Sequence, residues 1–301
     1  MKNRFLVYLM LLFAMLFWSI SYIWSKIVFT VYSPITTIFL RLVLASVFFL
    51  AVGLISRTLQ RPRRGDLKFI LLLSVFQPFL YFLGENMGLY HLTPTIVAIV
   101  VSTIPLFVAF AEFYFFHTRL TPVHYLGILI SITGVALVLY QPGSSRTDIH
   151  GLGIGFLLLA VGAAVAYSVL IVKKTRRYNP FTLVTYQNLV GIAYFLPLFL
   201  ILDWRDFIST RITMPVVLAL GGLAIFSSSL AFIFFVHGLK EIGITRASIF
   251  GNLIPPLTAG LSILILGEHL HALNYLGIAL VITGVFLAQN RSRSLEPAVG
   301  E

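Results

Sequence analysis

A chain of 301 residues of which 59% are hydrophobic and only 10% are charged is too apolar for a soluble globular protein. Its formal net charge of +11 does not indicate nucleic-acid binding, because the Lys and Arg residues lie in short gaps between apolar runs. The absence of cysteine excludes disulfides, thiolate metal sites and a cysteine nucleophile.

Hydropathy predicts ten membrane-spanning helices, because a bilayer core needs roughly 20 apolar residues of helix. The first apolar stretch is too long for a signal peptide and no small-residue cleavage site follows it. Breaks between the stretches carry turn signals such as Ser33-Pro34 and Thr93-Pro94. The fold class is therefore an all-α integral membrane protein without a soluble domain. In chain order the predicted helices cover residues 5–28, 34–56, 69–90, 94–116, 122–140, 151–172, 181–202, 215–239, 247–267 and 272–290.

The distribution of positive charge predicts the orientation in the membrane. Of the 21 basic residues, sixteen fall on the side that holds the N-terminus and four on the opposite side, while Arg41 lies within a helix. Cytoplasmic loops carry an excess of Lys and Arg. We therefore predict a multi-pass protein of the bacterial inner membrane with both termini in the cytoplasm.

The chain also repeats itself. Residues 95–140 align without gaps onto residues 245–290, with fifteen of 46 positions identical, including Tyr-Leu-Gly-Ile at 125–128 and 275–278. We divide the chain into a first five-helix repeat at 1–141, a second at 150–290, and a short cytoplasmic tail at 291–301. Because five is odd, the second repeat enters the membrane inverted. Inverted repeats around a central cavity are typical of alternating-access carriers.

Both repeats close on a short turn followed by a helix that contains the Tyr-Leu-Gly-Ile and Thr-Gly-Val motifs, and Leu266-Gly267-Glu268 forms the second of these turns. In these features the chain resembles the EamA-type carriers of the drug/metabolite transporter superfamily. The first turn, Phe116-His117-Thr118, lacks the Gly-Glu pair, which argues against two symmetric gates. The resemblance implies a cavity lined mainly by helices 1, 3, 4, 6, 8 and 9, and export of amino acids or related metabolites without ATP.

Small and polar residues form a stripe on one face of the fourth helix, and the repeat places a matching stripe on the ninth. We expect both stripes to face inward, with Ser102 and Asn252 on a common cavity and with Pro105 and Pro255 breaking the two helices. Close helix packing through small residues is the alternative. The stripes are Ala98, Ser102, Pro105, Ala109 and Glu112, and Ser248, Asn252, Pro255, Ala259 and Ser262.

Arg41 and Glu85 are the clearest ionisable residues inside the predicted membrane span, whereas Lys26 and Glu112 lie near helix ends. Arg41 lies about 10 Å and Glu85 roughly 8 Å from the predicted outer surface at helical rise. We therefore expect the two charges to pair, either as a substrate site or as a structural bridge. The further cavity residues that we predict are Trp18, Tyr22, Gln77, Tyr81, Gln187 and Asn188.

Enzyme motifs do not appear in the sequence: it contains no P-loop, H-E-x-x-H or G-x-S-x-G. We interpret His269-x-His271 as a surface turn and expect no metal or cofactor. The sequence therefore favours a carrier that exports a small metabolite such as an amino acid. An exchanger of anionic or phosphorylated metabolites and an intramembrane enzyme remain alternatives. The expected partners are the metabolite and the lipid bilayer, with a homodimer left open.

Single cysteines introduced into this cysteine-free chain test the predicted orientation. An impermeant thiol reagent added from outside should label replacements of Ser145 and Ser209 but not replacements of Arg63 and Tyr178. The opposite labelling pattern would reverse the orientation.

Overall fold

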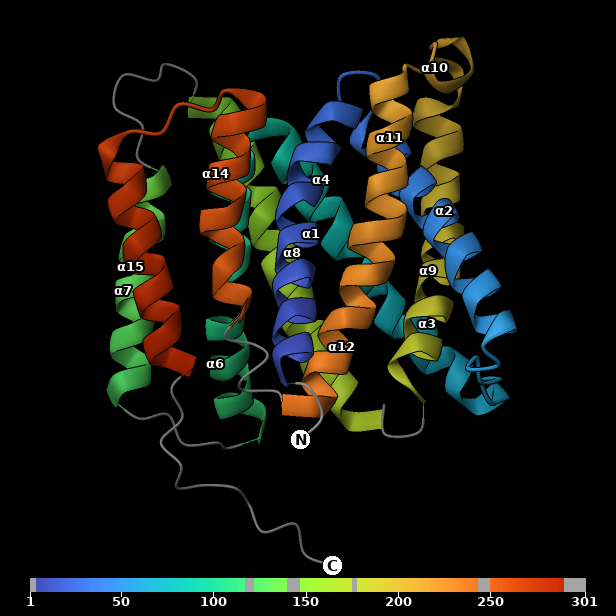
Figure 1. The fold of residues 1–301 in the computed structure, drawn as a ribbon, viewed down its shortest axis with the longest axis horizontal. Coiled ribbons are helices and arrows are strands. Elements are labelled where there is room, and N and C mark those ends of the chain that lie inside the picture. The colour runs from blue at the N-terminus through green and yellow to red at the C-terminus, as the bar shows by residue number, and fades with distance from the viewer. Residues whose placement is uncertain (1–3, 117–121, 140–146, 175–177, 243–249, 290–301) are drawn as a thin grey trace, which may run out of the picture.

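The computed structural model describes residues 4–116, 122–139, 147–174, 178–242 and 250–289, and this part of the chain is built from helices (Figure 1). Eight helical spans are long and apolar enough to cross a membrane, and the shorter apolar helices Phe250–Leu266 and Ala272–Ala288 bring the described spans to ten. They coincide with the ten predicted segments. The predicted ten-helix membrane fold is therefore confirmed.

The first repeat contains five spans, of which the third and fourth are interrupted. The third changes its helical geometry at η2, and the fourth divides at Thr103. Its elements are α1 (Arg4–Val28), α2 (Pro34–Ile55), η1 (Arg64–Asp66), α3 (Leu67–Ser74), η2 (Val75–Leu80), α4 (Tyr81–His91), α5 (Pro94–Ser102), α6 (Ile104–Phe116) and α7 (Pro122–Leu139).

The second repeat also contains five spans. The seventh span of the chain changes its helical geometry at η4 and the eighth at η5, and the described part of the ninth begins as η6 and continues as α14. The start of α1 and the end of the last helix lie at the same end of the bundle (Figure 1). The elements are α8 (Thr147–Lys174), α9 (Pro180–Leu198), η4 (Phe199–Asp203), α10 (Trp204–Ser209), α11 (Met214–Gly222), η5 (Leu223–Leu230), α12 (Ala231–Ile242), η6 (Phe250–Leu253), α14 (Ile254–Leu266) and α15 (Ala272–Gln289).

Local sequence explains where several helices begin. Ser33, Thr93 and Asn179 each accept a hydrogen bond from the backbone N–H three residues further on, and each precedes a proline at the first helical position. This combination satisfies one of the free N–H groups of the first turn and presets the helical φ angle. The turn signals of the sequence therefore become the starts of α2, α5 and α9.

Helices α2 and α9, which pack against each other, are each anchored at their start by the opposite repeat. Thr36 donates to Asp203 of η4 through its backbone N–H and its hydroxyl, at 3.0 and 2.8 Å. Its repeat counterpart Thr182 accepts a hydrogen bond from the backbone N–H of Gln60 at 3.0 Å. The two helices that carry Arg41 and Gln187 are thus fixed by reciprocal contacts between the repeats.

The Leu266-Gly267-Glu268 turn joins the repeats at another place. Gly267 adopts a left-handed conformation with φ of 66°, which ends α14 and suits a residue without a side chain. The carboxylate of Glu268 then accepts hydrogen bonds from the hydroxyls of Ser262 and of Thr95, the latter at 2.8 Å. Through this carboxylate the end of α14 is tied to the start of α5 in the first repeat.

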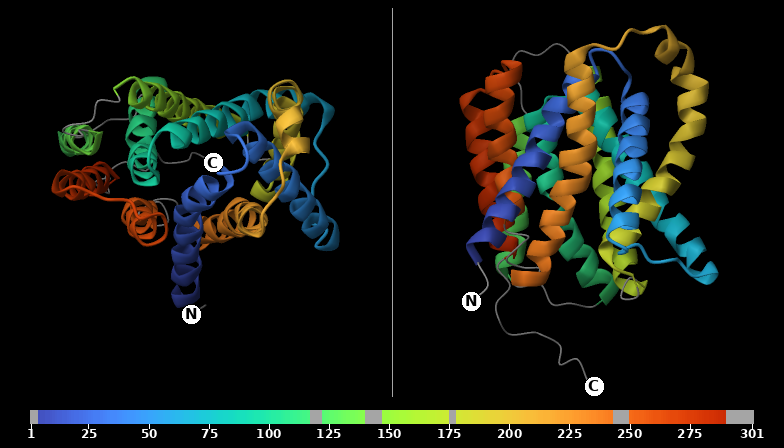
Figure 2. Two further views of the ribbon diagram at one scale, coloured as in Figure 1. Left: turned by 90° about the horizontal axis from the view of Figure 1, so that it is seen from above. Right: turned by 45° about the vertical axis from the view of Figure 1, so that its right-hand side comes forward.

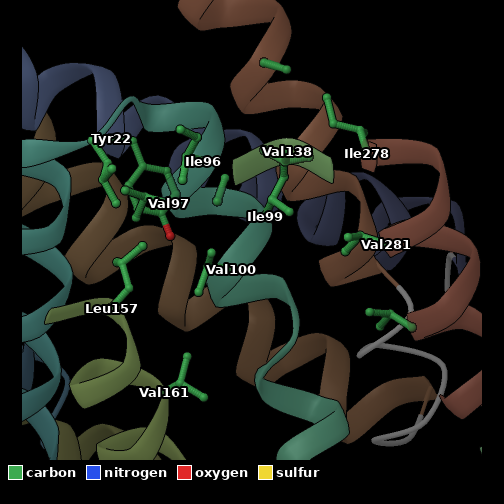
Figure 3. Close-up of a cluster of buried hydrophobic side chains, with 14 of the residues drawn as sticks. Tyr22, Ile96, Val97, Ile99, Val100, Val138, Leu157, Val161, Ile278 and Val281 are labelled. Carbon is green, nitrogen blue, oxygen red and sulfur yellow. The ribbon is translucent and has the colours of Figure 1, made fainter. Parts of the chain in front are cut away.

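A cluster of buried hydrophobic side chains packs α1, α5 and α8 against the two peripheral helices α7 and α15 (Figure 3). Helices α7 and α15 lie side by side at one edge of the bundle (Figures 1 and 2). Their glycines allow close backbone approach: a Cβ atom on Gly284 would lie 2.5 Å from the carbonyl oxygen of Gly127. A Cβ on Gly277 would likewise lie 2.7 Å from the carbonyl oxygen of Gly134. The Tyr-Leu-Gly-Ile and Thr-Gly-Val motifs that the two repeats share are therefore packing motifs, because their glycines meet in one interface.

The predicted inward stripe of the fourth helix is not continuous. Ala98 is buried but Pro105 is exposed, because α5 ends at Ser102 and α6 begins at Ile104, which interrupts the helical register. In the ninth helix Pro255, Ala259 and Ser262 are buried, as expected for an inward stripe. Each proline is the second residue of the α-helix that follows a boundary. The Glu112 side chain and Ser248 lie outside the described residues.

Replacing Gly284 by Ala should lower the thermal unfolding midpoint of the detergent-purified protein. The added methyl group would overlap the backbone of α7, and overpacking of this kind costs about 1–3 kcal/mol. Gly162→Ala on α8 is the matched control, because its Cβ would meet no atom within 4 Å and alanine favours helix. Equal midpoints for the two variants would contradict the close α7–α15 contact.

Candidate functional site

An internal cavity of about 340 Å³ lies between the two repeats and is lined from both. Helices 2 and 7 contribute to its walls in addition to helices 1, 3, 4, 6, 8 and 9 that the family resemblance implies. Ser102 and Asn252 are not among its lining residues, and the Ser102 hydroxyl instead donates to the Ile99 carbonyl at 2.7 Å. The other eight predicted cavity residues all line it: Trp18, Tyr22, Arg41, Gln77, Tyr81, Glu85, Gln187 and Asn188.

Sequence reasoning missed the serines of the eighth span. Ser227 and Ser228 line the cavity within η5, and they are the repeat counterparts of Gln77 and Pro78 in η2. Two signals were available: three consecutive hydroxyl residues in an apolar helix, and the offset of 150 residues from an already suspected position. Aromatic residues missed in the same way are Phe82, Tyr167, Phe232 and Phe235.

Arg41 on α2 is held by the second repeat. Its Nε donates to the hydroxyl of Ser228 at 2.6 Å and its Nη2 to that of Ser227 at 3.2 Å. The guanidinium carbon lies 4.7 Å from the centre of the Phe82 ring, a distance at which a cation and an aromatic face attract each other. Two hydroxyls and one ring therefore fix the orientation of a cation that is only 7% exposed.

Glu85 on α4 is surrounded by tyrosines. Its Oε1 accepts hydrogen bonds from the hydroxyls of Tyr81 at 2.8 Å and of Tyr22 at 3.3 Å. The carboxylate is 9% exposed and lines the same cavity as Arg41.

The predicted direct pairing of Arg41 with Glu85 is wrong. The two groups line the same cavity, but within the described chain their hydrogen bonds go to serine and tyrosine hydroxyls. Arg41 and Glu85 lie at a similar depth in the membrane and therefore line one cavity, but the nearby hydroxyl groups are their direct hydrogen-bond partners. Of the two readings left open by the sequence, the arrangement disfavours a structural bridge.

The interruptions of the third and eighth spans lie at equivalent positions of the repeats and on the cavity wall. At Gln77 the backbone leaves helical conformation, with φ of −144° and ψ of 117°. Its carbonyl oxygen accepts a hydrogen bond from Nε2 of Gln187 in the second repeat at 3.1 Å. The carbonyl oxygen of Ser227 accepts one from Nε1 of Trp18 in the first repeat, also at 3.1 Å. Each interrupted helix is therefore completed by a donor from the opposite repeat.

Gln187 is the repeat counterpart of Arg41 at an offset of 146 residues. Arg41 contacts the serine side chains of η5, and Gln187 contacts the backbone of η2. The amide oxygen of Gln187 also accepts a hydrogen bond from the Tyr167 hydroxyl at 3.2 Å. The two counterpart residues thus contact equivalent interrupted segments, but one donor is charged and the other is neutral.

The remaining polar candidates lie away from the cavity wall. Lys26 donates to the carbonyl of Tyr90 at 3.4 Å and does not line the cavity. Among the described residues, no group of three His, Cys, Asp or Glu side chains could hold a metal ion. His269 and His271 lie in the exposed hairpin between α14 and α15.

Replacing Gln187 by Leu should lower the thermal unfolding midpoint, because the Gln77 carbonyl and the Tyr167 hydroxyl would both lose a partner. An unpaired buried polar group costs about 1–3 kcal/mol. Tyr186→Phe is the matched control, since it removes a neighbouring hydroxyl but keeps the ring that packs beside Leu183. If both variants melted like the unmodified protein, the contact between Gln187 and η2 would be energetically unimportant.

Comparison with known proteins agrees with this architecture. The EamA-like transporter family matches the chain twice, over residues 5–140 and 151–289. Similar proteins include an uncharacterized transporter of Archaeoglobus fulgidus, 25% identical over 90% of this chain and 94% of that protein. A probable terminal-alkyne amino-acid exporter of Streptantibioticus cattleyicolor is 24% identical, over 84% of this chain and 82% of that protein. A solved crystal structure shares the fold, with a TM-score of 0.67 at 19% identity, covering 94% of this chain and 96% of that one. The chain is a multi-pass membrane protein and belongs to the EamA-like transporter family.

Proposed function

We propose that the protein exports a small amino-acid-like metabolite across the bacterial inner membrane by alternating access, without ATP and with both termini in the cytoplasm. The observation that carries this proposal is the presence of one cation, Arg41, and one carboxylate, Glu85, on a single cavity between inverted repeats. Carriers built from inverted repeats bind their substrates at the repeat interface. Charged side chains inside a membrane are costly, so their retention on a cavity supports a binding role.

The size and lining of the cavity support a small amphipathic substrate. Its volume of about 340 Å³ lies at the lower end of the range for small-molecule sites. Aromatic side chains from both repeats surround the two charges and offer contacts to an apolar body. The name of the Streptantibioticus cattleyicolor relative, a probable amino-acid exporter, supports the same substrate class.

An exchanger of phosphorylated metabolites is less consistent with the lining. A phosphate dianion calls for two or more basic groups converging on one site, and Arg41 is the one basic side chain among the described lining residues. Glu85 on the same cavity would repel such a substrate. An intramembrane enzyme would need an activated nucleophile, and the sequence contains none of the hydrolase or metalloprotease motifs that supply one.

Purified protein in liposomes tests the transport proposal directly. Vesicles preloaded with unlabelled phenylalanine or leucine should accumulate the labelled amino acid by counterflow without ATP, whereas vesicles preloaded with glucose 6-phosphate should not exchange it. Cells that produce the protein should also tolerate a toxic analogue such as p-fluorophenylalanine better than cells that lack it. Counterflow of sugar phosphates without counterflow of any amino acid would overturn the proposal.

A further inference from the structure

The internal repeat shows that both charges of the cavity come from the same half of the molecule. Arg41 corresponds to Gln187 in the second repeat, and Glu85 corresponds to Phe235. All four of these residues line the cavity. The first repeat therefore presents ionic groups at two positions where the second presents an amide and an aromatic ring.

Arg41 retains unused hydrogen-bonding capacity. Its Nε and Nη2 atoms already donate to Ser228 and Ser227, which occupies one edge of the planar guanidinium group. A guanidinium has five N–H donors, so the edge formed by Nη1 and Nη2 still has donors without a partner in the described part of the chain. That edge can form two parallel hydrogen bonds with a carboxylate.

Glu85 also uses only part of its hydrogen-bonding capacity, because only one of its carboxylate oxygens accepts hydrogen bonds in the described part of the chain. Both tyrosine hydroxyls donate to Oε1, and Oε2 has no hydrogen-bond partner among the described residues. An ammonium group carries three donors and a full positive charge, and it satisfies such an oxygen. The Arg41 guanidinium and the Glu85 carboxylate thus both have free hydrogen-bonding capacity, carry opposite charge and line one cavity.

The second repeat contributes an apolar surface to the same cavity. Phe232 and Phe235 of α12 line the cavity, and Phe235 lies 5.1 Å from Trp18, measured between ring centres. Buried aromatic side chains contribute large apolar contact areas. This surface suits an aliphatic or aromatic side chain and offers no charge to a head group.

We propose that the repeats divide the recognition of one substrate: Arg41 binds its carboxylate and Glu85 its ammonium group, while α12 receives its apolar side chain. The ligand class is an α-amino acid with an aliphatic or aromatic side chain. This assignment rests on the proposed transport function and adds the orientation of the substrate. The charged end of the substrate stays with the first repeat, because the second repeat has no ionic counterpart at either position.

Binding of phenylalanine and two of its analogues to the full-length protein in detergent tests the assignment. 3-Phenylpropanoate lacks the ammonium group and 2-phenylethylamine lacks the carboxylate, so each reports on one half of the head group. Ligand-induced increases of the unfolding midpoint give the affinities. Glu85→Gln should weaken the binding of phenylalanine and of 2-phenylethylamine by about tenfold or more, and it should leave the affinity for 3-phenylpropanoate unchanged. Arg41→Gln should weaken phenylalanine and 3-phenylpropanoate and leave 2-phenylethylamine unchanged.

Phe235→Ala is the matched variant, because it alters the counterpart of Glu85 in the second repeat. It should weaken all three ligands by a similar factor, since they share the phenyl ring. If Arg41→Gln does not purify as a folded protein, Arg41→Lys replaces it. The lysine keeps the charge but loses the guanidinium edge, so carboxylate ligands should weaken selectively.

The outcomes separate this assignment from the transport function. If unmodified protein carries amino acids but the Arg41 and Glu85 variants weaken both analogues equally, the assignment is wrong and the transport proposal stands. If Phe235→Ala weakened the binding of only one of the two analogues, the assignment would also be wrong. If the unmodified protein neither transports nor binds any amino acid, the proposed function itself fails.

Discussion

A membrane interior provides no water to hydrogen-bond backbone groups, and this constraint governs the centre of the protein. Interruptions of the third and eighth spans expose the carbonyl oxygens of Gln77 and Ser227 at the cavity. Each oxygen is satisfied by a side chain of the opposite repeat, Gln187 in one case and Trp18 in the other. The irregular backbone is tolerated because the two halves complete each other.

The same constraint explains the surroundings of the two buried charges. Arg41 and Glu85 cannot rely on solvent, so serine and tyrosine hydroxyls and an aromatic face stabilise them. Hydroxyls stabilise a charge without neutralising it, whereas a direct ion pair would use up the capacity of both groups. The cavity therefore keeps a cation and an anion that remain able to bind a ligand.

The repeats are alike in architecture but differ in chemistry. Helices α7 and α15 use equivalent glycines to approach each other, and Thr36 and Thr182 anchor equivalent helix starts through different partners. At the cavity, by contrast, the replacement of Arg41 by Gln187 and of Glu85 by Phe235 removes both charges from the second half. Duplication preserves the packing that both halves need, and divergence gives the cavity two unlike walls.

Much of this architecture is determined by the sequence alone. Apolar length predicts the ten spans, because the thickness of the bilayer sets a minimum helix length. Cap residues followed by proline predict several helix starts, because that chemistry involves only neighbouring residues. The internal offset identifies the repeats, and the cost of burying charge singles out Arg41 and Glu85.

Only the tertiary structure decided how these residues are used. The direct pair of Arg41 and Glu85 does not form, and Ser227 and Ser228 of the second repeat take the place of the expected carboxylate. The division of the fourth helix likewise turned Pro105 outward although its spacing predicted an inward face. Length, capping and repetition act along the chain, so the sequence determines them. The partner of a buried polar group is selected from every side chain that the folded helices bring within hydrogen-bonding distance, so only the fold reveals it.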